Sequence, residues 1–230
     1  MSEEMMLCDA HCHTAGISLC SRVPADQLVE LFVQEGLGAI VLTNHYKRAH
    51  VRGEFRDWVK RYVDEYELTR ALGEKKGLKV FFGVEVTPDE MTQNDFTIYG
   101  LTKEDVVNGP ELYALSFDAL CDFAHSRNAL IYHAHPFRRT TPVDGTKIDG
   151  TEINCHPLYK TCAEKEVRAF ADKYGLRLSC GADYHGDTYK AHCGMWIPKS
   201  IETTARFVEY IRENKRPELC IAPDPVDPIE

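Results

Sequence analysis

Short apolar runs alternate with longer amphipathic runs along most of this sequence, and that alternation limits the fold more than any other feature. The apolar runs predict buried β-strands, and the runs between them have the spacing of amphipathic helices. We expect strands at 7–11, 38–43, 78–86, 96–101, 129–136, 148–154 and 176–183. Because strands that alternate with helices form parallel sheets covered on both faces, the pattern predicts an α/β fold.

Helices are expected between these strands, at 24–36, 53–76, 110–126, 163–174 and 201–214. The first of them has Pro24 in its opening turn and Gly36 as its stop, which are typical helix boundaries. This series of strand and helix units closes most naturally into a barrel, whose functional residues gather at the carboxyl ends of the strands. Residues at the strand ends should then face one common mouth.

A single domain is expected over residues 1–222, followed by a Pro-rich tail at 223–230, since no repeat or linker divides the chain. With 43% hydrophobic and 27% charged residues, the composition is that of a soluble globular protein. No window approaches the roughly 18 apolar residues of a membrane span. The acidic start of the sequence also lacks the pattern of a secretory signal. We therefore expect a cytoplasmic protein with no membrane partner.

Cysteine usage and net charge exclude two further classes of protein. The nine cysteines are odd in number, scattered, and contain no CxxC pair. They predict reduced, mostly buried thiols rather than a disulfide framework. A formal charge of -9 disfavours a long nucleic acid as partner, because a phosphate backbone requires a basic face.

Histidine and acidic side chains recur at the predicted strand ends. The first two, His11 and His13, should project to the same side of a strand because side chains alternate with a period of two. The full set is His11, His13, His45, Glu85, His135, Asp183 and His185. Imidazoles and carboxylates of this kind bind divalent metal ions. Around one barrel mouth they predict a hydrolytic site with more than one metal.

Six short motifs carry these residues in a fixed order. They are Asp-Ala-His-Cys-His-Thr at 9–14, Thr-Asn-His at 43–45, Gly-Val-Glu at 83–85, Ala-His-Pro-Phe-Arg at 134–138, Asp-Gly-Thr-Glu-Ile-Asn at 149–154 and Cys-Gly-Ala-Asp-Tyr-His at 180–185. In order, spacing and strand context they closely resemble the motifs of the PHP (polymerase and histidinol phosphatase) family. The resemblance covers about residues 6–186.

The resemblance implies a distorted (β/α)7 barrel that holds two or three divalent ions, Mn, Fe or Zn. It implies hydrolysis of a small phosphorylated substrate by a hydroxide that bridges the metals, with no side-chain nucleophile. Carried over by position, the ligands of one metal are His11, His13, Glu85 and Asp183. Glu85 would bridge to a second metal that His135 also binds, and His45 and His185 would bind a third.

Three positions depart from the family pattern. Asn44 stands where an Asp is usual, which removes an acceptor for a ligand imidazole and implies a weaker third metal. Cys20 is a candidate for a missing loop ligand, with a merely nearby thiol as the alternative. Asp95 or His133 is a candidate for a further ligand. The alternative for Asp95 is that it caps a turn.

Basic residues near the motifs are candidates for substrate binding. Arg138 follows the His-Pro motif directly, and its planar fork suits two phosphate oxygens, although a surface salt bridge is the alternative. Arg22 and Lys47 are candidates for a basic rim, with ordinary solvated charges as the alternative. His50 and His156 lie in loops, and their spacing assigns them no role.

Two other functions compete with the phosphoesterase. An amidohydrolase-type barrel also starts with His-x-His, but its bridging group is usually a modified lysine, and the strand that ends in Glu85 has no lysine at that place. The other is a barrel without catalysis that uses its metals to bind an anion, which Asn44 and the missing loop ligand would favour. A fold by itself does not decide among them.

Overall fold

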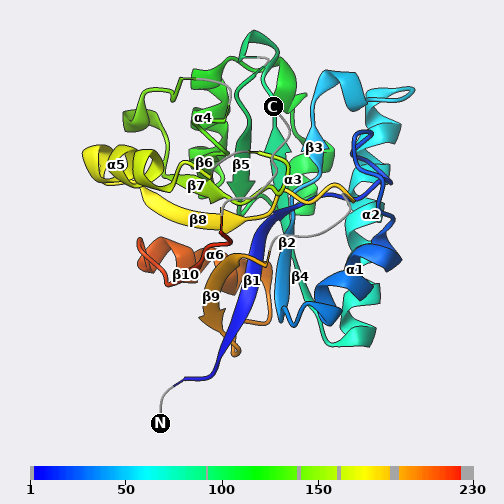
Figure 1. Cartoon of the computed structure of the whole chain (residues 1–230). Coiled ribbons are helices and arrows are strands. Elements are labelled where there is room, and N and C mark those ends of the chain that lie inside the picture. Colours follow the sequence, from blue (N-terminus) through cyan, green and yellow to red (C-terminus); the bar gives the residue numbers. More distant parts are fainter. Residues whose placement is uncertain (1–2, 92, 139–140, 160–161, 187–191, 224–230) are drawn as a thin grey trace.

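The computed structural model describes residues 3–91, 93–138, 141–159, 162–186 and 192–223, and its sheet curls into a nearly closed barrel (Figure 1). Around the barrel the strands are β1 (Met5–Cys12), β2 (Ala39–Leu42), β4 (Lys79–Val86), β5 (Phe96–Tyr99), β6 (Leu130–His133), β7 (Gly150–Asn154) and β8 (Arg177–Gly181). The short β3 (His45–Tyr46) pairs with β4, while β9 (Gly194–Pro198) and β10 (Leu219–Cys220) extend the sheet beyond β1. The predicted α/β barrel is confirmed.

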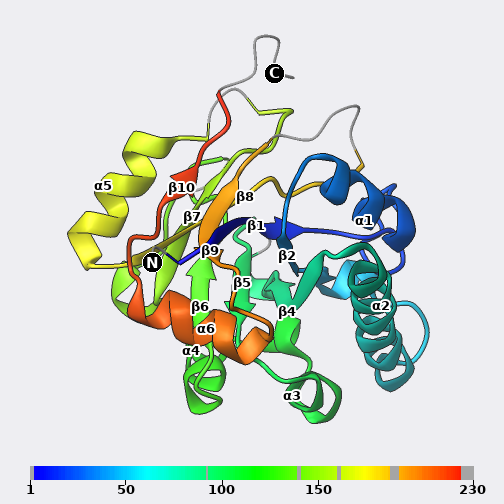
Figure 2. The same ribbon diagram turned by 90° about the horizontal axis from the view of Figure 1, so that it is seen from below.

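Helices cover the outside of the barrel and its lower end, which is the end opposite the carboxyl ends of the parallel strands. They are α1 (Ala25–Gln34), α2 (Phe55–Lys76), α3 (Lys103–Asn108), α4 (Phe117–Ser126), α5 (Glu164–Tyr174) and α6 (Thr204–Glu213), with single 3₁₀ turns at Arg48–His50, Asp89–Met91, Leu112–Ala114 and Gly145–Lys147. Figure 2 shows α1 and α2 on one side, α5 on the other and α6 beneath the sheet. Phe207 of α6 stacks on Phe81 with ring centroids 5.2 Å apart, which seals the lower end with apolar side chains.

The predicted helix at 110–126 is shorter than expected and begins later. Ser116 caps α4, and its hydroxyl accepts a hydrogen bond from the Ala119 N–H at 3.2 Å. The sequence interpretation missed α3, whose capping box joins Thr102 and Asp105. In the described part of the chain, no helix is both long and apolar enough to cross a membrane. Of the predicted tail, 224–230 lie outside the described residues.

The expectation that the strands are all parallel is wrong for β5. This strand runs antiparallel to both β4 and β6. The connection at 87–95 is shorter than the dozen or so residues that a parallel crossover needs, so the chain turns back directly. As a result, the amino end of β5 lies at the mouth, where the neighbouring strands have their carboxyl ends. Asp95, which precedes β5, is therefore brought to the mouth.

A register shift in β1 decides which way its histidines point. Asp9 pairs with Ile40, whereas Cys12 pairs with Leu42, so β1 contains an extra residue. Before the shift, the even-numbered residues of β1, such as Met6, point into the barrel and belong to the apolar cluster that fills its lower end. The odd-numbered Leu7 points outward and belongs to the apolar cluster under the helices. A bulge of this kind exchanges the two faces. It turns the odd-numbered His11 toward the inside of the barrel.

The barrel closes where the upper end of β1 meets the end of β8. The Asp183 N–H donates to the His11 carbonyl at 2.8 Å. The buried Asp9 carboxylate accepts from the His11 N–H at 3.0 Å and from the Ala182 N–H at 3.1 Å. Gly181 permits this approach, because a Cβ there would lie 2.6 Å from the Cβ of His11. The same junction therefore closes the barrel and holds two predicted ligands in place.

Replacing Asp9 by Ala should lower the free energy of unfolding by about 2–4 kcal/mol, since two buried N–H groups lose their acceptor. Asp9→Asn keeps one acceptor oxygen and should lose less. Urea denaturation of the metal-free protein measures both, with the exposed Asp118→Ala as a control expected to change stability by less than about 1 kcal/mol. Wild-type stability in Asp9→Ala would contradict the role of this carboxylate in closing the barrel.

Candidate metal centre

The first group of predicted ligands converges inside the mouth. The ligand atoms of His11, His13, Glu85 and Asp183 all lie within 4.8 Å of one another, and all four residues are buried. His11 Nε2 is 3.2 Å from Glu85 Oε1, and His13 Nε2 is 3.0 Å from Asp183 Oδ1. The resemblance assigned these same four residues to one metal. The structure brings them together, and their role as ligands remains a prediction.

A second group shares Glu85 with the first. His135 Nε2 lies 3.2 Å from Glu85 Oε1 and 3.7 Å from Asp95 Oδ2. The other candidate for this place, His133, faces elsewhere, since its Nε2 is 3.1 Å from Asn94 Oδ1. Burial lowers the pKa of His133 to about 3, so its imidazole is neutral. Of the two candidates, the structure brings only Asp95 to the centre.

A third group lies on the outer side of His13. The ring nitrogens of His13, His45 and His185 lie within 4.8 Å of one another, with 3.2 Å between His45 Nε2 and His185 Nε2. Cys20 lies beside them. Burial alone would raise the pKa of its thiol, but hydrogen bonds from His185, His45 and His50 outweigh burial and lower this pKa to about 3. The candidate loop ligand is thus a thiolate next to two imidazoles, and His50 also reaches it.

Several buried ligand atoms in these groups lie close to one another yet form no hydrogen bond of proper geometry among the described residues. They are His11 Nε2, His13 Nε2, His45 Nδ1, Glu85 Oε2 and Asp183 Oδ1. Burying polar and charged atoms without partners is costly. Divalent cations would bind to all of them at once, and imidazole with carboxylate is a donor set that such cations accept. The residues present therefore fit a centre of more than one divalent metal ion.

Protons balance the charge of the centre when no cation is bound. Burial would raise the pKa of Glu85, but the neighbouring His45 and His11 outweigh it and hold this pKa well below its usual range. Burial likewise opposes protonation of His45, yet Glu85 raises the pKa of that imidazole to about 10. For His13, burial and the nearby His185 and His45 lower the pKa, so this ring stays neutral. Two buried carboxylates thus keep several imidazoles charged.

Glu152 supports the centre from behind and had no predicted role. Its carboxylate oxygens lie 3.0 and 3.1 Å from His11 Nδ1, which directs the opposite nitrogen of that ring toward Glu85. It also accepts from the His135 N–H at 3.2 Å. One fully buried carboxylate therefore orients parts of two metal groups. The sequence did contain a signal for this role, since Glu152 is the only charged residue in the strand Gly150–Asn154.

Asn44 keeps an acceptor at the position where the resemblance expects Asp. Its amide oxygen accepts from the Thr14 N–H at 2.8 Å and from the Ser18 hydroxyl at 2.9 Å. The Ser18 oxygen in turn lies 3.2 Å from His13 Nδ1. Asn44 thus orients the first loop and, through Ser18, a ligand imidazole. What the substitution removes is a negative charge, and a weaker third metal remains a prediction.

No family model and no curated protein sequence matches this chain. Solved structures with the same fold do. A two-domain protein of Bacteroides vulgatus, which contains a predicted PHP-like metal-dependent phosphoesterase, superimposes with a TM-score of 0.69 at 16% identity, over 96% of this chain and 66% of that protein. This chain has the PHP-type fold. The predicted resemblance to the PHP family is confirmed at the level of the fold.

Two further structures share the PHP-type fold. One is a protein of Bifidobacterium adolescentis to which a metal-dependent phosphoesterase activity is ascribed by inference, with a TM-score of 0.57, 14% identity, and coverage of 91% of this chain and 98% of that one. The other is an amidohydrolase of Chromobacterium violaceum with bound sulfate and no metal, with a TM-score of 0.58, 12% identity, and coverage of 89% and 96%. At such identities the likeness concerns the fold alone.

Two predicted ligands of the PHP-type barrel have unusual backbone conformations. His135 has φ of 34° and Asp183 has φ of 52°, which side chains other than glycine rarely adopt. Each residue follows a barrel strand, β6 or β8, by two positions. Strained residues of this kind persist where the surrounding structure holds them, and they concentrate at functional sites. The sharp turn at each strand end directs both side chains toward the centre.

Of the predicted substrate-binding residues, Arg138 lies at the centre itself. Its Nη1 is 2.6 Å from Asp183 Oδ2, its other amino group contacts Asn154, and its guanidinium lies 4.2 Å from the ring centroid of Tyr159. Lys47 is half-buried and follows His45 by two residues, so its charge acts on that imidazole. The side chain of Arg22 is exposed, and the backbone N–H of this residue donates to the His185 carbonyl at 2.8 Å. Their contact with a substrate remains a prediction.

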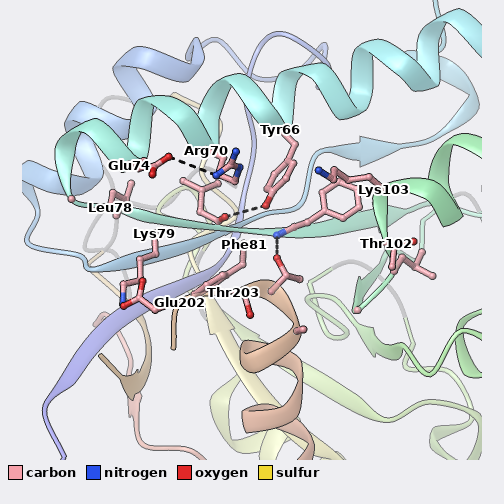
Figure 3. Close-up of a pocket in the computed structure, with 17 residues that line it drawn as sticks. Tyr66, Arg70, Glu74, Leu78, Lys79, Phe81, Thr102, Lys103, Glu202 and Thr203 are labelled. Carbon is pink, nitrogen blue, oxygen red and sulfur yellow. Dashed lines mark hydrogen bonds and ion pairs between the residues drawn. The ribbon is translucent and has the colours of Figure 1, made fainter. Parts of the chain in front are cut away.

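A cavity lies at the other end of the PHP-type barrel. It measures about 630 Å³ and lies between α2, the start of β4 and the start of α6 (Figure 3). Figure 3 shows Lys79 and Glu202 side by side at its edge, with 2.6 Å between Nζ and Oε1. Lys79 and Glu85 are separated by most of the length of β4, so the cavity is remote from the candidate ligands. None of its lining residues is a histidine, and it offers no comparable donor set.

Replacing Glu152 by Ala should weaken binding of divalent metal by about 10- to 100-fold, because His11 loses the partner that orients it. Glu152→Gln, which keeps an acceptor without the charge, should lie between Ala and wild type. Mn²⁺ titration followed by calorimetry measures the affinity, and circular dichroism checks the fold. The matched control is Glu164→Gln on α5, whose carboxylate pairs with Arg168 at the surface. Unchanged affinity in Glu152→Ala would exclude the supporting role.

Metal affinity should rise with pH from about 6 up to about 10, the pKa of His45 in the metal-free protein. In the metal-free protein, carboxylates outweigh burial and raise the pKa values of His11, His45 and His185, with a further contribution from Cys20 for the last two. His11 therefore holds its proton at neutral pH, as does His45, whose pKa is raised to about 10. Because a metal binds only the neutral imidazole, binding must release protons and becomes easier as pH increases. Calorimetric titration with Mn²⁺ in buffers of different ionisation enthalpy counts the protons. Binding without proton release would contradict this charge balance.

Proposed function

We propose that this protein hydrolyses phosphoester bonds of a small phosphorylated molecule with two or three bound divalent ions, Mn, Fe or Zn. The observation that carries the proposal is the overlap of the three ligand groups. Glu85 belongs to the first and second groups, and His13 to the first and third. The two oxygens of Glu85 can bind two cations, whereas His13 can bind one through Nε2, so groups that overlap at these residues place their cations next to one another. Closely spaced cations are typical of enzymes that hydrolyse phosphoesters.

The residues of the centre have distinct parts in this proposal. Bound divalent ions would supply an activated water at neutral pH and neutralise charge on the phosphoryl group. Glu85 and Asp183 provide the negative charge that holds the ions, and Glu152 keeps His11 in the orientation for binding. Arg138 is paired with Asp183 and 13% of its side chain is exposed, so its guanidinium group lies at the edge of the centre. There it would bind phosphoryl oxygens.

The depth of the centre supports a small substrate. The side chains of His11, His13 and Glu85 are fully buried. Those of His185 and Arg138 are 15% and 13% exposed, so an anionic group would approach past these two. Lys47 adds a positive charge near His45. A long nucleic acid is disfavoured by the net charge of -9, and a cytoplasmic location stays an expectation.

An amidohydrolase-type activity is the second candidate, because the amidohydrolase of Chromobacterium violaceum has the same fold. That chemistry usually relies on a modified lysine as the bridging group. In this chain the position is taken by Glu85, whose two oxygens lie 3.2 Å from His135 Nε2 and 2.6 Å from His45 Nδ1. A carboxylate that spans two ligand groups favours the phosphoesterase. A barrel that binds an anion without catalysis is the third candidate.

The test combines metal content with turnover. The purified protein is stripped with a chelator, reloaded with Mn, Fe or Zn, and assayed on p-nitrophenyl phosphate, its diester, phosphorylated metabolites, nucleotides and phosphopeptides. We expect turnover that requires metal, and a loss of well over about 100-fold in Glu85→Gln. The matched control is Glu74→Gln, an exposed glutamate on α2 that should retain activity.

Two results would reject the phosphoesterase. Full metal occupancy without hydrolysis of any phosphoester would favour the barrel without catalysis. Metal-dependent cleavage of amides or lactones, with no cleavage of phosphoesters, would favour the amidohydrolase. Equal activity of Glu85→Gln and wild type would show that the turnover arises from a contaminating enzyme.

A further inference from the structure

Cysteines from separate segments gather on the outer face of the barrel. The sulfur atoms of Cys155, Cys180 and Cys193 all lie within 4.8 Å of one another, and all three residues are buried. Cys155 Sγ and Cys180 Sγ are 3.8 Å apart. A fourth, Cys162, forms a side-chain hydrogen bond with Cys155. We call these four residues the cysteine cluster.

The cysteine cluster is separate from the candidate metal centre. Residues along β8 alternate between the two faces, and Leu178 and Cys180 belong to the apolar cluster under the helices. Asn154, at the end of β7, contacts Arg138 on the side of the centre, and the next residue, Cys155, belongs to the outer apolar cluster. The sheet therefore lies between the cysteine cluster and the metal ligands.

The geometry favours a shared metal over a disulfide. A disulfide joins two sulfur atoms at about 2.05 Å, so it would account for only two of the four cysteines. In a tetrahedral site with Zn–S bonds of about 2.3 Å, the sulfur atoms are about 3.8 Å apart. The Cys155 to Cys180 distance has this value. Three of the thiols are mutually adjacent, and Cys162 contacts Cys155, so a movement of the Cys162 side chain would complete a set of four ligands around one ion.

We propose that Cys155, Cys180 and Cys193, with Cys162 as fourth ligand, bind one zinc ion in a structural site. Thiolates are soft ligands that select zinc over magnesium, calcium or manganese. Four protein ligands leave no open position, so the site is structural rather than catalytic. The ligands follow one another at spacings of 7, 18 and 13 residues, with no CxxC pair, which is why their spacing gave no sign of a zinc site.

The zinc would anchor the segment that carries two ligands of the metal centre. Cys180 precedes Asp183 in the chain, and Cys193 follows His185. Cys155 and Cys162 lie between β7 and α5. One ion would thus tie together the ends of β7 and β8, the start of β9 and the approach to α5. This stabilises the strained turn at Asp183 from the opposite face of the sheet.

Cobalt substitution tests the site without using catalytic activity. Co²⁺ bound by several thiolates gives a charge-transfer band in the near ultraviolet and intense visible bands of tetrahedral geometry. The experiment uses Cys20→Ser, since Cys20 lies beside His45 and His185 and would add a thiolate signal from the metal centre. We expect a charge-transfer band that saturates at one Co²⁺ per cysteine cluster and is bleached by Zn²⁺.

Variants in the Cys20→Ser background locate the signal. Adding Cys155→Ser or Cys180→Ser should abolish the band and remove one zinc per chain from the purified protein, as measured by elemental analysis. Cys220→Ser and Cys121→Ser are the matched controls and should keep both. Cys220 is near the cysteine cluster, but its sulfur contacts the His192 carbonyl, and Cys121 lies on α4.

Three results would overturn the zinc site. The first is a Cys20→Ser protein with no thiolate-to-cobalt band, which decides the question even if the further variants do not fold. The second is a native disulfide between Cys155 and Cys180, detected by mass spectrometry of the purified protein. The third is a band that persists in Cys155→Ser and Cys180→Ser. Failure of the phosphoesterase assays would leave each of these readouts unchanged.

Discussion

The buried carboxylates of Glu85 and Asp183 are the constraint on which the mouth of the barrel depends. Charged carboxylates removed from water are tolerated only beside compensating positive charge. The imidazoles at the surrounding strand ends face these two carboxylates, with His11 and His13 each in contact with both. Without cations, protons on the imidazoles provide the balance, and with cations the same atoms become ligands. The bulge in β1 and the strained turn at Asp183 serve to aim side chains at this one region.

The sequence could predict the members of the centre because of a general property of the fold. Parallel strands wound into a barrel place their carboxyl ends at one mouth, so residues at successive strand ends meet although they are far apart in the chain. His45, His135 and His185 were identified in this way. Asp95 could be named only as a candidate, because its place depends on β5 running antiparallel. That direction follows from the short connection at 87–95, which already separates the predicted strands at 78–86 and 96–101, so the sequence contained this signal and the expectation of parallel strands overlooked it.

Supporting contacts were beyond sequence reasoning for a different reason. Glu152 lies 141 residues from His11 in the chain, and the hydrogen bond between them depends on the exact curvature of the sheet. Ser18 and Asn44 act together on His13 through a loop with no regular period. The cysteine cluster combines residues that face outward at the same end of the barrel, and only the folded chain shows that they meet. Local patterns predict strands and their ends, whereas contacts between distant strands require the three-dimensional arrangement.

The central claim is that the mouth of this PHP-type barrel is a centre of several metal ions. The most direct measurement is anomalous diffraction from crystals of the protein loaded with Mn²⁺. The account predicts two or three anomalous peaks, one within the group of His11, His13, Glu85 and Asp183, and a neighbour on the side of His135 and Asp95 or of His45 and His185. Absence of any peak between Glu85 and Asp183 in Mn²⁺-loaded crystals would contradict it. A single peak with the other two groups unfilled would contradict the multinuclear centre.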